Sequence, residues 1–209
     1  MTKKYELVLD DTISFWGWKL FRIRALISFG SVEVGDLGGY IEKEENLSHD
    51  GNAWVSGDAK VSGNAKVSGD AKVSGNAKVS GDAKVSGNAE VSGNAEVSGN
   101  AKVSGDAKVS GNAKVSGDAK VSGNAEVSGN AEVWGNAKVS ELGDLIVFKN
   151  HWSSGRHFTY TKSNKMWKVG CFYGTGQELI EKAYRDSKKS GNYYKACVDF
   201  VENLEKLGD

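Results

Sequence analysis

The residues most able to do chemistry lie together near the C-terminus. The segment His151-Trp152-Ser153-Ser154-Gly155-Arg156 combines an imidazole, an indole and a guanidinium, and further aromatic and basic residues follow it closely. Cations beside aromatic faces suit a planar or anionic ligand, such as a nucleotide, or the acidic surface of a host protein. The alternative is a core of aromatic side chains with solvated lysines around it. The candidate binding residues are His151, Trp152, Arg156, Tyr160, Lys165, Trp167 and Lys168.

Catalytic and metal-binding chemistry have less support in the sequence. His151 could pair with Ser153 or Ser154 as base and nucleophile, but no acidic residue is evident to orient it. The other histidines, His49 and His157, belong to no cluster with metal-ligand spacing. We therefore expect no catalytic residue, no metal and no cofactor, and we interpret His49 as a surface residue.

Residues 55–140 repeat the pattern V-S-G-[N/D]-A-[K/E] with little variation. A period of six fits neither a helix nor a plain strand, so the repeat predicts a solenoid. Valine favours extended backbone and fills the interior, and alanine is small enough for the corners. Glycine followed by asparagine or aspartate supplies the turns.

The pattern, an aliphatic residue at position one and a small residue at position five, resembles the hexapeptide-repeat family. That resemblance implies a left-handed parallel β-helix with three hexapeptides per coil. The entry segment, residues 35–55, looks like the start of uncharacterised hexapeptide proteins of the putative-acyltransferase type, and the tail KMWKVGCFYGTGQELIEKAY resembles phage and prophage proteins. Acyltransferases of this kind use a histidine as general base, but the repeat contains none, so no catalytic residue carries over.

Three hexapeptides per coil would stack residues that are 18 apart in sequence. Two of the three resulting columns of charged residues alternate lysine and glutamate over most of their length, which avoids like charges opposite each other. A 36-residue duplication would create much of the same alternation. The third column is Lys66, Lys84, Lys102, Lys120 and Lys138. It could bind a polyanion, or it could be a solvated face that also discourages edge pairing.

The regions on either side of the repeat predict two smaller parts. Residues 1–54 predict a β-hairpin that turns at Trp16-Gly17-Trp18, followed by an entry loop over residues 35–52. Residues 141–209 predict a β-hairpin and two helices, the first opened by a capping box at Thr175 and ended at Ser190-Gly191-Asn192. We expect the apolar stripe of the second helix, Tyr193 to Leu207, to pack in a core.

The sequence as a whole predicts a mainly β protein with parts 1–54, 55–140 and 141–209. Acidic and basic residues are equal in number, at 27 each, so neither nucleic acid nor a membrane is an expected partner. Cys171 and Cys197 are expected as buried free thiols of a cytoplasmic protein, in the host cytoplasm if a phage encodes it, with a disulfide as the alternative.

The leading functional hypothesis is a non-enzymatic binding or scaffold protein of phage type that forms a homo-oligomer, with a trimer favoured. Its solenoid would be a rigid spacer or oligomerisation unit, and its C-terminal module the working end. One version inhibits a host defence system by binding a protein or a nucleotide signal. The alternative is a divergent acyltransferase or another small-molecule enzyme.

Overall fold

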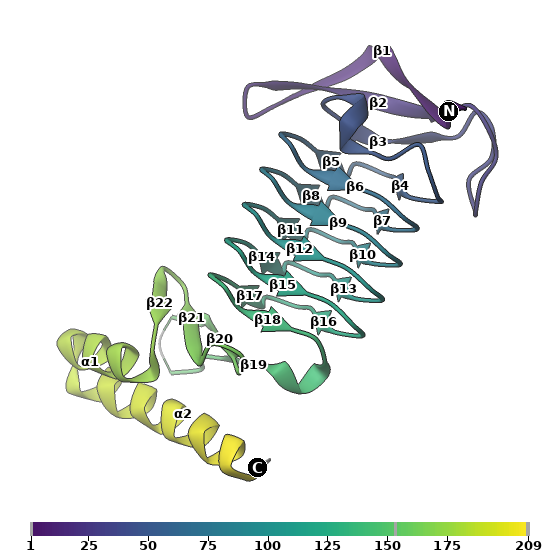
Figure 1. Ribbon diagram of the computed structural model, residues 1–209. Helices are drawn as coiled ribbons and strands as arrows, with labels where there is room; N and C mark the ends of the chain where they lie inside the picture. Colours follow the sequence, from purple (N-terminus) through teal and green to yellow (C-terminus); the bar gives the residue numbers. More distant parts are fainter. Residues whose placement is uncertain (1, 153, 208–209) are drawn as a thin grey trace. The chain divides into compact units, whose positions relative to one another are not determined.

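The computed structural model describes residues 2–152 and 154–207 (Figure 1). The chain divides into two compact units, Met1–Leu142 and Gly143–Asp209. The first unit holds an antiparallel hairpin and a parallel solenoid, and the second is a small α+β module. The expected fold class is thereby confirmed. The division into three parts at residues 54 and 140 stays a prediction.

Each hexapeptide of the solenoid contributes one two-residue strand that ends in valine. Every third strand pairs in parallel, so Glu90 lies between Lys72 and Lys108. This register confirms the 18-residue coil. The strands are β4 Trp54–Val55, β5 Lys60–Val61, β6 Lys66–Val67, β7 Lys72–Val73, β8 Lys78–Val79, β9 Lys84–Val85, β10 Glu90–Val91, β11 Glu96–Val97, β12 Lys102–Val103, β13 Lys108–Val109, β14 Lys114–Val115, β15 Lys120–Val121, β16 Glu126–Val127, β17 Glu132–Val133 and β18 Lys138–Val139.

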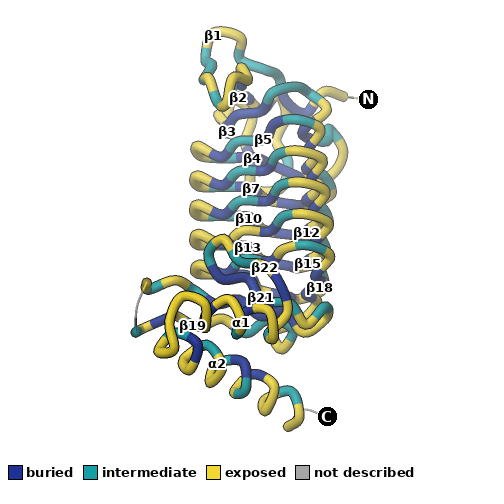
Figure 2. Tube along the Cα trace, turned by 90° about the vertical axis from the view of Figure 1, so that its left-hand side faces the viewer, coloured by how far each residue is buried: buried dark blue, intermediate teal, exposed yellow. Residues whose placement is uncertain are grey.

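Three sheets form the walls of the solenoid. Their strand orders are β4-β7-β10-β13-β16, β6-β9-β12-β15-β18 and, continuing from the N-terminal strands, β5-β8-β11-β14-β17. The valines and alanines of the repeat are fully or almost fully buried, and the residues between them face outward, which Figure 2 shows as alternating dark and light segments. One continuous apolar interior therefore runs through all the coils.

Glycine is favoured at the corners by the left-handed backbone and, where another coil lies close by, also by space. Gly87 has a φ of 70°, and a Cβ there would lie 2.9 Å from the backbone nitrogen of Gly105 in the next coil. Gly129 has a similar φ of 64°, but a Cβ there would meet nothing within 4 Å. The two positions separate the cost of the left-handed backbone from the cost of crowding.

The N-terminal residues form a cap on the first coil. Strands β1 (Tyr5–Phe15) and β2 (Trp18–Ala25) are antiparallel and turn at Trp16-Gly17, as predicted. The predicted loop over residues 35–52 is wrong, since it contains strand β3 (Leu37–Ile41) and a 3₁₀ helix, η1 (Glu44–Asn46). Strand β3 pairs with both β2 and β5, and a Cβ on Gly39 would lie 2.7 Å from the carbonyl oxygen of Ala59. The glycines of this segment thus permit close backbone approach rather than a loop.

Two buried side chains in this cap stand in for a missing coil. Within the stack, the carbonyls of Gly87 and Ala89 accept hydrogen bonds from the coil before them. At the first coil, Lys4 Nζ donates to the corresponding carbonyls of Gly51 and Ala53, at 3.2 and 2.9 Å. Asn46 Nδ2 likewise donates to the carbonyls of Gly63 and Ala65, at 3.1 and 2.9 Å. The cap thereby supplies donors that would otherwise come from another coil.

The second unit is a four-stranded antiparallel sheet with two helices. Its strands, in sheet order, are β19 (Leu145–Lys149), β20 (His157–Thr161), β21 (Met166–Val169) and β22 (Phe172–Gly174). Helices α1 (Gly176–Asp186) and α2 (Lys188–Leu207) follow, and a short 3₁₀ helix, η2 (Leu142–Asp144), precedes the sheet. The core consists of Phe158, Tyr160, Trp167, Val169, Leu179, Val198 and Val201.

The capping box at Thr175 is confirmed, but the predicted helix break is wrong. Thr175 accepts a hydrogen bond from the backbone of Glu178, whose carboxylate accepts one from the Thr175 backbone. Ser187, in extended conformation, ends α1, and Ser190-Gly191-Asn192 lies inside α2. A Cβ on Gly191 would overlap the Tyr184 ring, so this glycine allows the two helices to approach closely.

Replacement of a corner glycine separates the two costs described above. We expect Gly129→Ala to lower the free energy of unfolding by about 1 kcal/mol, the cost of the left-handed backbone alone. Gly87→Ala should lower it further, because its Cβ meets the next coil. Equilibrium urea denaturation of both variants measures the difference, and equal losses would contradict the close coil spacing.

Asn46→Ala tests the cap. We expect it to lower the free energy of unfolding by about 2–4 kcal/mol, because two carbonyls lose their donor. The matched control is Asn88→Ala, since Asn88 is an exposed corner residue in the middle of the stack whose amide donates to Asp106 of the next coil. The control should cost about 1 kcal/mol or less. Hydrogen exchange at the first coil reports the same effect locally, and unchanged exchange in Asn46→Ala would show that the cap does not depend on this side chain.

Candidate binding surfaces

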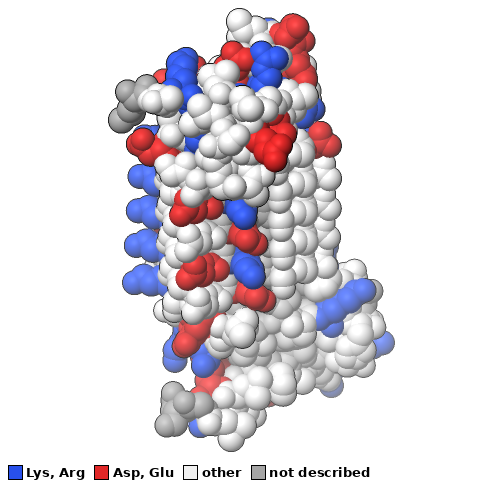
Figure 3. All heavy atoms as spheres, turned by 90° about the vertical axis from the view of Figure 1, so that its right-hand side faces the viewer, with Lys and Arg blue, Asp and Glu red and all other residues white. Residues whose placement is uncertain are grey.

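The five candidate lysines of the solenoid lie in one column. They begin strands β6, β9, β12, β15 and β18, pair in register and are exposed. Figure 3 shows basic groups stacked along one edge of the solenoid. We call this surface, made by Lys66, Lys84, Lys102, Lys120 and Lys138, the lysine face. Polyanion binding there stays a prediction.

The seven C-terminal candidates are divided between different parts of their module. His151 and Trp152 line a groove against helix α2, and Tyr160, Lys165 and Trp167 line a second groove near the end of that helix. Lys168 is buried and donates to the carbonyl of Gly170. The Arg156 side chain lies over the same glycine, where a Cβ would come within 3.0 Å of it. Ser153, which belongs to the predicted segment, lies outside the described residues.

The first groove has a volume of about 500 Å³ and apolar walls, and we call it the aromatic groove. The rings of Trp152 and Tyr193 stack at a centroid distance of 4.6 Å, and His151 meets the Trp152 ring edge-on at 5.1 Å. Phe200 from α2 and the edge strand β19 complete the walls. Such a groove suits an apolar or planar group, with His151 and Lys149 as polar neighbours.

The second groove is smaller, at about 290 Å³, and more strongly charged. Its floor includes Trp167 and Tyr160, both almost fully buried in the module core. The Tyr160 hydroxyl donates to Glu205 at 2.7 Å, and burial together with this carboxylate raises the pKa of Tyr160. Tyr160 and Trp167 therefore belong to the core of the module. This agrees with the alternative interpretation of the sequence, a core of aromatic side chains.

Helix α2 supplies wall residues that the sequence did not identify as binding candidates. The apolar stripe from Tyr193 to Leu207 was expected in a core, and this is wrong. Phe200 is 55% exposed and Leu207 is 82% exposed, Tyr193 and Leu204 are exposed as well, and Cys197 is only partly buried. Val198 and Val201 form the core side of the helix instead. The alternating spacings of four and three predict that these residues share one side of the helix. The spacings do not predict which side of the helix faces the sheet.

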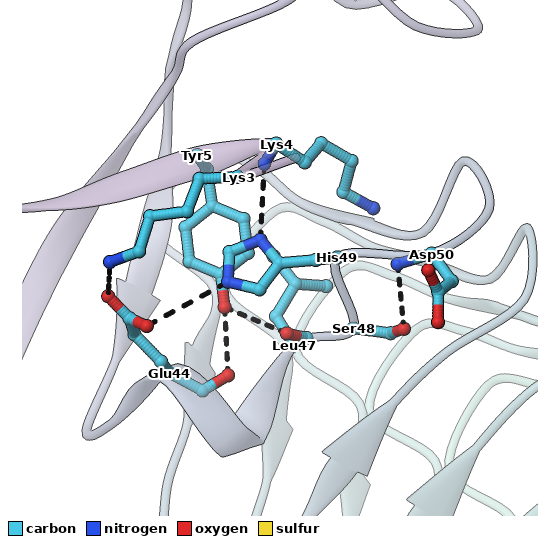
Figure 4. A network of polar contacts seen from close by, with 8 residues as sticks. All are labelled: Lys3, Lys4, Tyr5, Glu44, Leu47, Ser48, His49 and Asp50. Carbon is cyan, nitrogen blue, oxygen red and sulfur yellow. Dashed lines mark hydrogen bonds and ion pairs between the residues drawn. The ribbon is translucent and has the colours of Figure 1, made fainter. Parts of the chain in front are cut away.

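A polar network joins the N-terminal strand to the entry segment (Figure 4). His49 was expected at the surface, but its ring stacks on Tyr5 at 4.4 Å and its Nδ1 accepts a hydrogen bond from the Lys4 backbone at 3.2 Å. Its Nε2 lies 3.8 Å from Glu44, which also pairs with Lys3 at 2.7 Å. The Tyr5 hydroxyl donates a hydrogen bond to the carbonyl of Leu47 at 2.7 Å, and burial raises the pKa of Tyr5. The network therefore links the start of strand β1 to the entry segment.

Burial also affects the ammonium group of Lys4 in this network. Desolvation lowers the pKa of Lys4 to about 8, although Asp50 and Asp70 act in the opposite direction. The side chain packs against the Phe29 ring, with Nζ 4.7 Å from its centroid. Lys4 therefore has a structural role, as a donor to the first coil.

Two further properties concern only the described part of the chain. No group of three or more histidine, cysteine, aspartate or glutamate side chains there could hold a metal ion. None of the described helices is long and apolar enough to cross a membrane.

Comparison with protein families gives a match in the solenoid segment. A family model described as "Bactofilin: Polymer-forming cytoskeletal" matches residues 53–143. The chain is a β-helix repeat protein. A search of curated proteins finds no match.

The matched segment coincides with the coils, from strand β4 to the residues just after β18. The match does not cover the N-terminal cap or the C-terminal module. It carries no support for the acyltransferase-type resemblance, the phage origin or the role in host defence, which stay predictions.

The two cysteines differ in exposure, and their reactivity should differ in the same way. Both are free thiols, as expected, but Cys171 is exposed rather than buried, whereas Cys197 is partly buried. Burial raises the pKa of the Cys197 thiol, which lowers its thiolate fraction at neutral pH.

We expect Ellman's reagent to modify the Cys197→Ser variant, which retains Cys171, about tenfold or more faster than the Cys171→Ser variant. Equal rates would contradict the placement of Cys197 in the wall of the aromatic groove.

Proposed function

We propose that this protein is a non-enzymatic, polymer-forming structural protein in which the solenoid is the assembling unit. The observation that carries the proposal is the match of a polymer-forming family model to residues 53–143, the segment that builds the coils. A homo-oligomeric protein follows from this proposal.

The physical character of the solenoid supports a structural role. Its interior is filled by fully buried valine and alanine, and adjacent coils are joined by backbone hydrogen bonds of about 2.9 Å, such as Lys72 N to Ala89 O. A continuous core and regular bonding make such a solenoid stiff. The repeat from Val55 to Ser140 contains no histidine and no cysteine, so it offers few groups for acid–base or nucleophilic chemistry.

Within this proposal the C-terminal module is the end that binds a further partner. The aromatic groove, with Trp152 and Tyr193 stacked in its wall, supports that role. A trimeric assembly and the capture of a host protein or nucleotide are finer versions of the same proposal, and they rest on the sequence resemblance and the candidate residues alone.

Sedimentation velocity of the purified full-length protein over a range of concentrations tests polymer formation. We expect species much larger than one 22.3 kDa chain, with a share that grows with protein concentration. A single-chain species at all concentrations would contradict the proposal. Trp152→Ala is the matched variant, since it alters the aromatic groove and leaves the repeat intact. It should assemble like the unchanged chain, and its failure to assemble would move the assembling unit to the C-terminal module.

A further inference from the structure

One face of the solenoid carries an exposed column of alternating charge. Lys72, Glu90, Lys108 and Glu126 begin strands β7, β10, β13 and β16 and stack in register. All four side chains are exposed, and among the described residues no ion pair within 4.0 Å involves them. Figure 3 shows the column as blue and red groups in turn. We call it the alternating face.

The other two faces are less suited to docking a copy of the same chain. The lysine face carries charges of one sign, so two such faces would repel each other. On the third face, Lys78 already pairs with Glu96 at 2.9 Å. There the Phe15 ring of the N-terminal hairpin lies 5.8 Å from the Nζ of both Lys60 and Lys78, and most of the column is only half exposed. The alternating face is therefore the surface whose charges remain available to a partner.

When two copies are aligned at all four levels, the order of charges on the alternating face is self-complementary in the antiparallel direction only. The column reads plus, minus, plus, minus from Lys72 to Glu126, and the reversed column reads minus, plus, minus, plus. An antiparallel second copy would place its Glu126 against Lys72 and its Lys108 against Glu90. A parallel copy in the same register would place like charges together. A two-fold axis between the levels of Glu90 and Lys108 generates the antiparallel arrangement, which is an isologous contact.

The surroundings of the column fit a contact of this kind. Ser74 and Ser92 flank it and add no charge, whereas the exposed corner residues Asp70 and Asp106 add a negative charge near the levels of Lys72 and Lys108. At its N-terminal end, the loop Gly30 to Val32 forms one wall of a cleft of about 470 Å³ that Trp54 and Lys72 also line. Glu90 lines the same cleft, so this loop lies beside the first two charges of the column, and Lys108 and Glu126 lie beyond the cleft.

We infer that the alternating face docks a second copy of this chain, side by side and antiparallel. The inference rests on the proposed function and adds to it the face, the partner and the direction of one contact. A 36-residue duplication alone would reproduce the alternation, so the charges need a test that depends on contact between chains.

Reversal of one central charge tests the contact. Lys108→Glu in the full chain turns both central pairs of the antiparallel contact into glutamate opposite glutamate. We expect the dissociation constant for side-by-side association, measured by sedimentation velocity at low salt, to rise by about tenfold or more. Association of the unchanged chain should weaken in 1 M salt, where the Debye length is about 3 Å. Association that does not respond to salt would overturn the inference.

The matched control makes the same change one hexapeptide earlier. Lys102→Glu removes a lysine and adds a glutamate on the lysine face, so it should leave the dissociation constant within about twofold of the unchanged chain. Equal weakening by both variants would show an effect of net charge alone and would overturn the inference. Circular dichroism of each variant checks that the solenoid is intact. If Lys108→Glu fails to fold, Lys108→Gln removes the same two pairs and keeps the readout.

A charge swap supplies the rescue. In the double variant Glu90→Lys with Lys108→Glu, the column reads plus, plus, minus, minus, and its reverse is still complementary at every level. We expect this variant to recover association that Lys108→Glu loses, and failure to recover would overturn the inference. If the unchanged chain never associates, the proposed function fails as well. If it assembles but neither Lys108 variant changes the association, only the antiparallel contact fails.

Discussion

The hydrogen bonds between one coil and the next are the constraint on which the first unit depends. Each coil presents backbone amides to the coil after it and carbonyls to the coil before it, as Lys72 N and Ala89 O show at 2.9 Å. These groups must be satisfied wherever the stack begins. The first coil is satisfied by strand β3, by the Lys4 ammonium and by the Asn46 amide. A lysine and an asparagine are buried there because each replaces donors of a coil.

The same constraint sorts the side chains on the outside of the solenoid. Since the register places residues 18 apart beside each other, a charge in one repeat always stands next to the charge three repeats away. One face can therefore be all lysine while another alternates, with no change in the interior. The charge pattern of the outer faces can therefore vary while the valine and alanine core stays the same. Such a pattern can determine which surfaces bind one another.

The sequence predicted the parts of the fold that depend on local pattern. The period of six led to the correct strands and register, the capping box at Thr175 to the start of α1, and Trp16-Gly17 to the hairpin turn. It failed where glycine serves close approach: Gly39 lies against the first coil and Gly191 against Tyr184, and both had been interpreted as loop or break. It also missed Lys4, whose acceptors come from residues 47 and 49 positions away. The candidate site was predicted only as a segment, because the side of α2 that faces the sheet depends on tertiary packing.

Electron microscopy of the purified full-length protein tests the central claim most directly, because it shows whether the solenoid is an assembling unit. The account predicts elongated assemblies at low salt in which neighbouring solenoids lie side by side and run in opposite directions. Isolated particles of single-chain mass under the same conditions, at concentrations where the solenoid is folded, would contradict it.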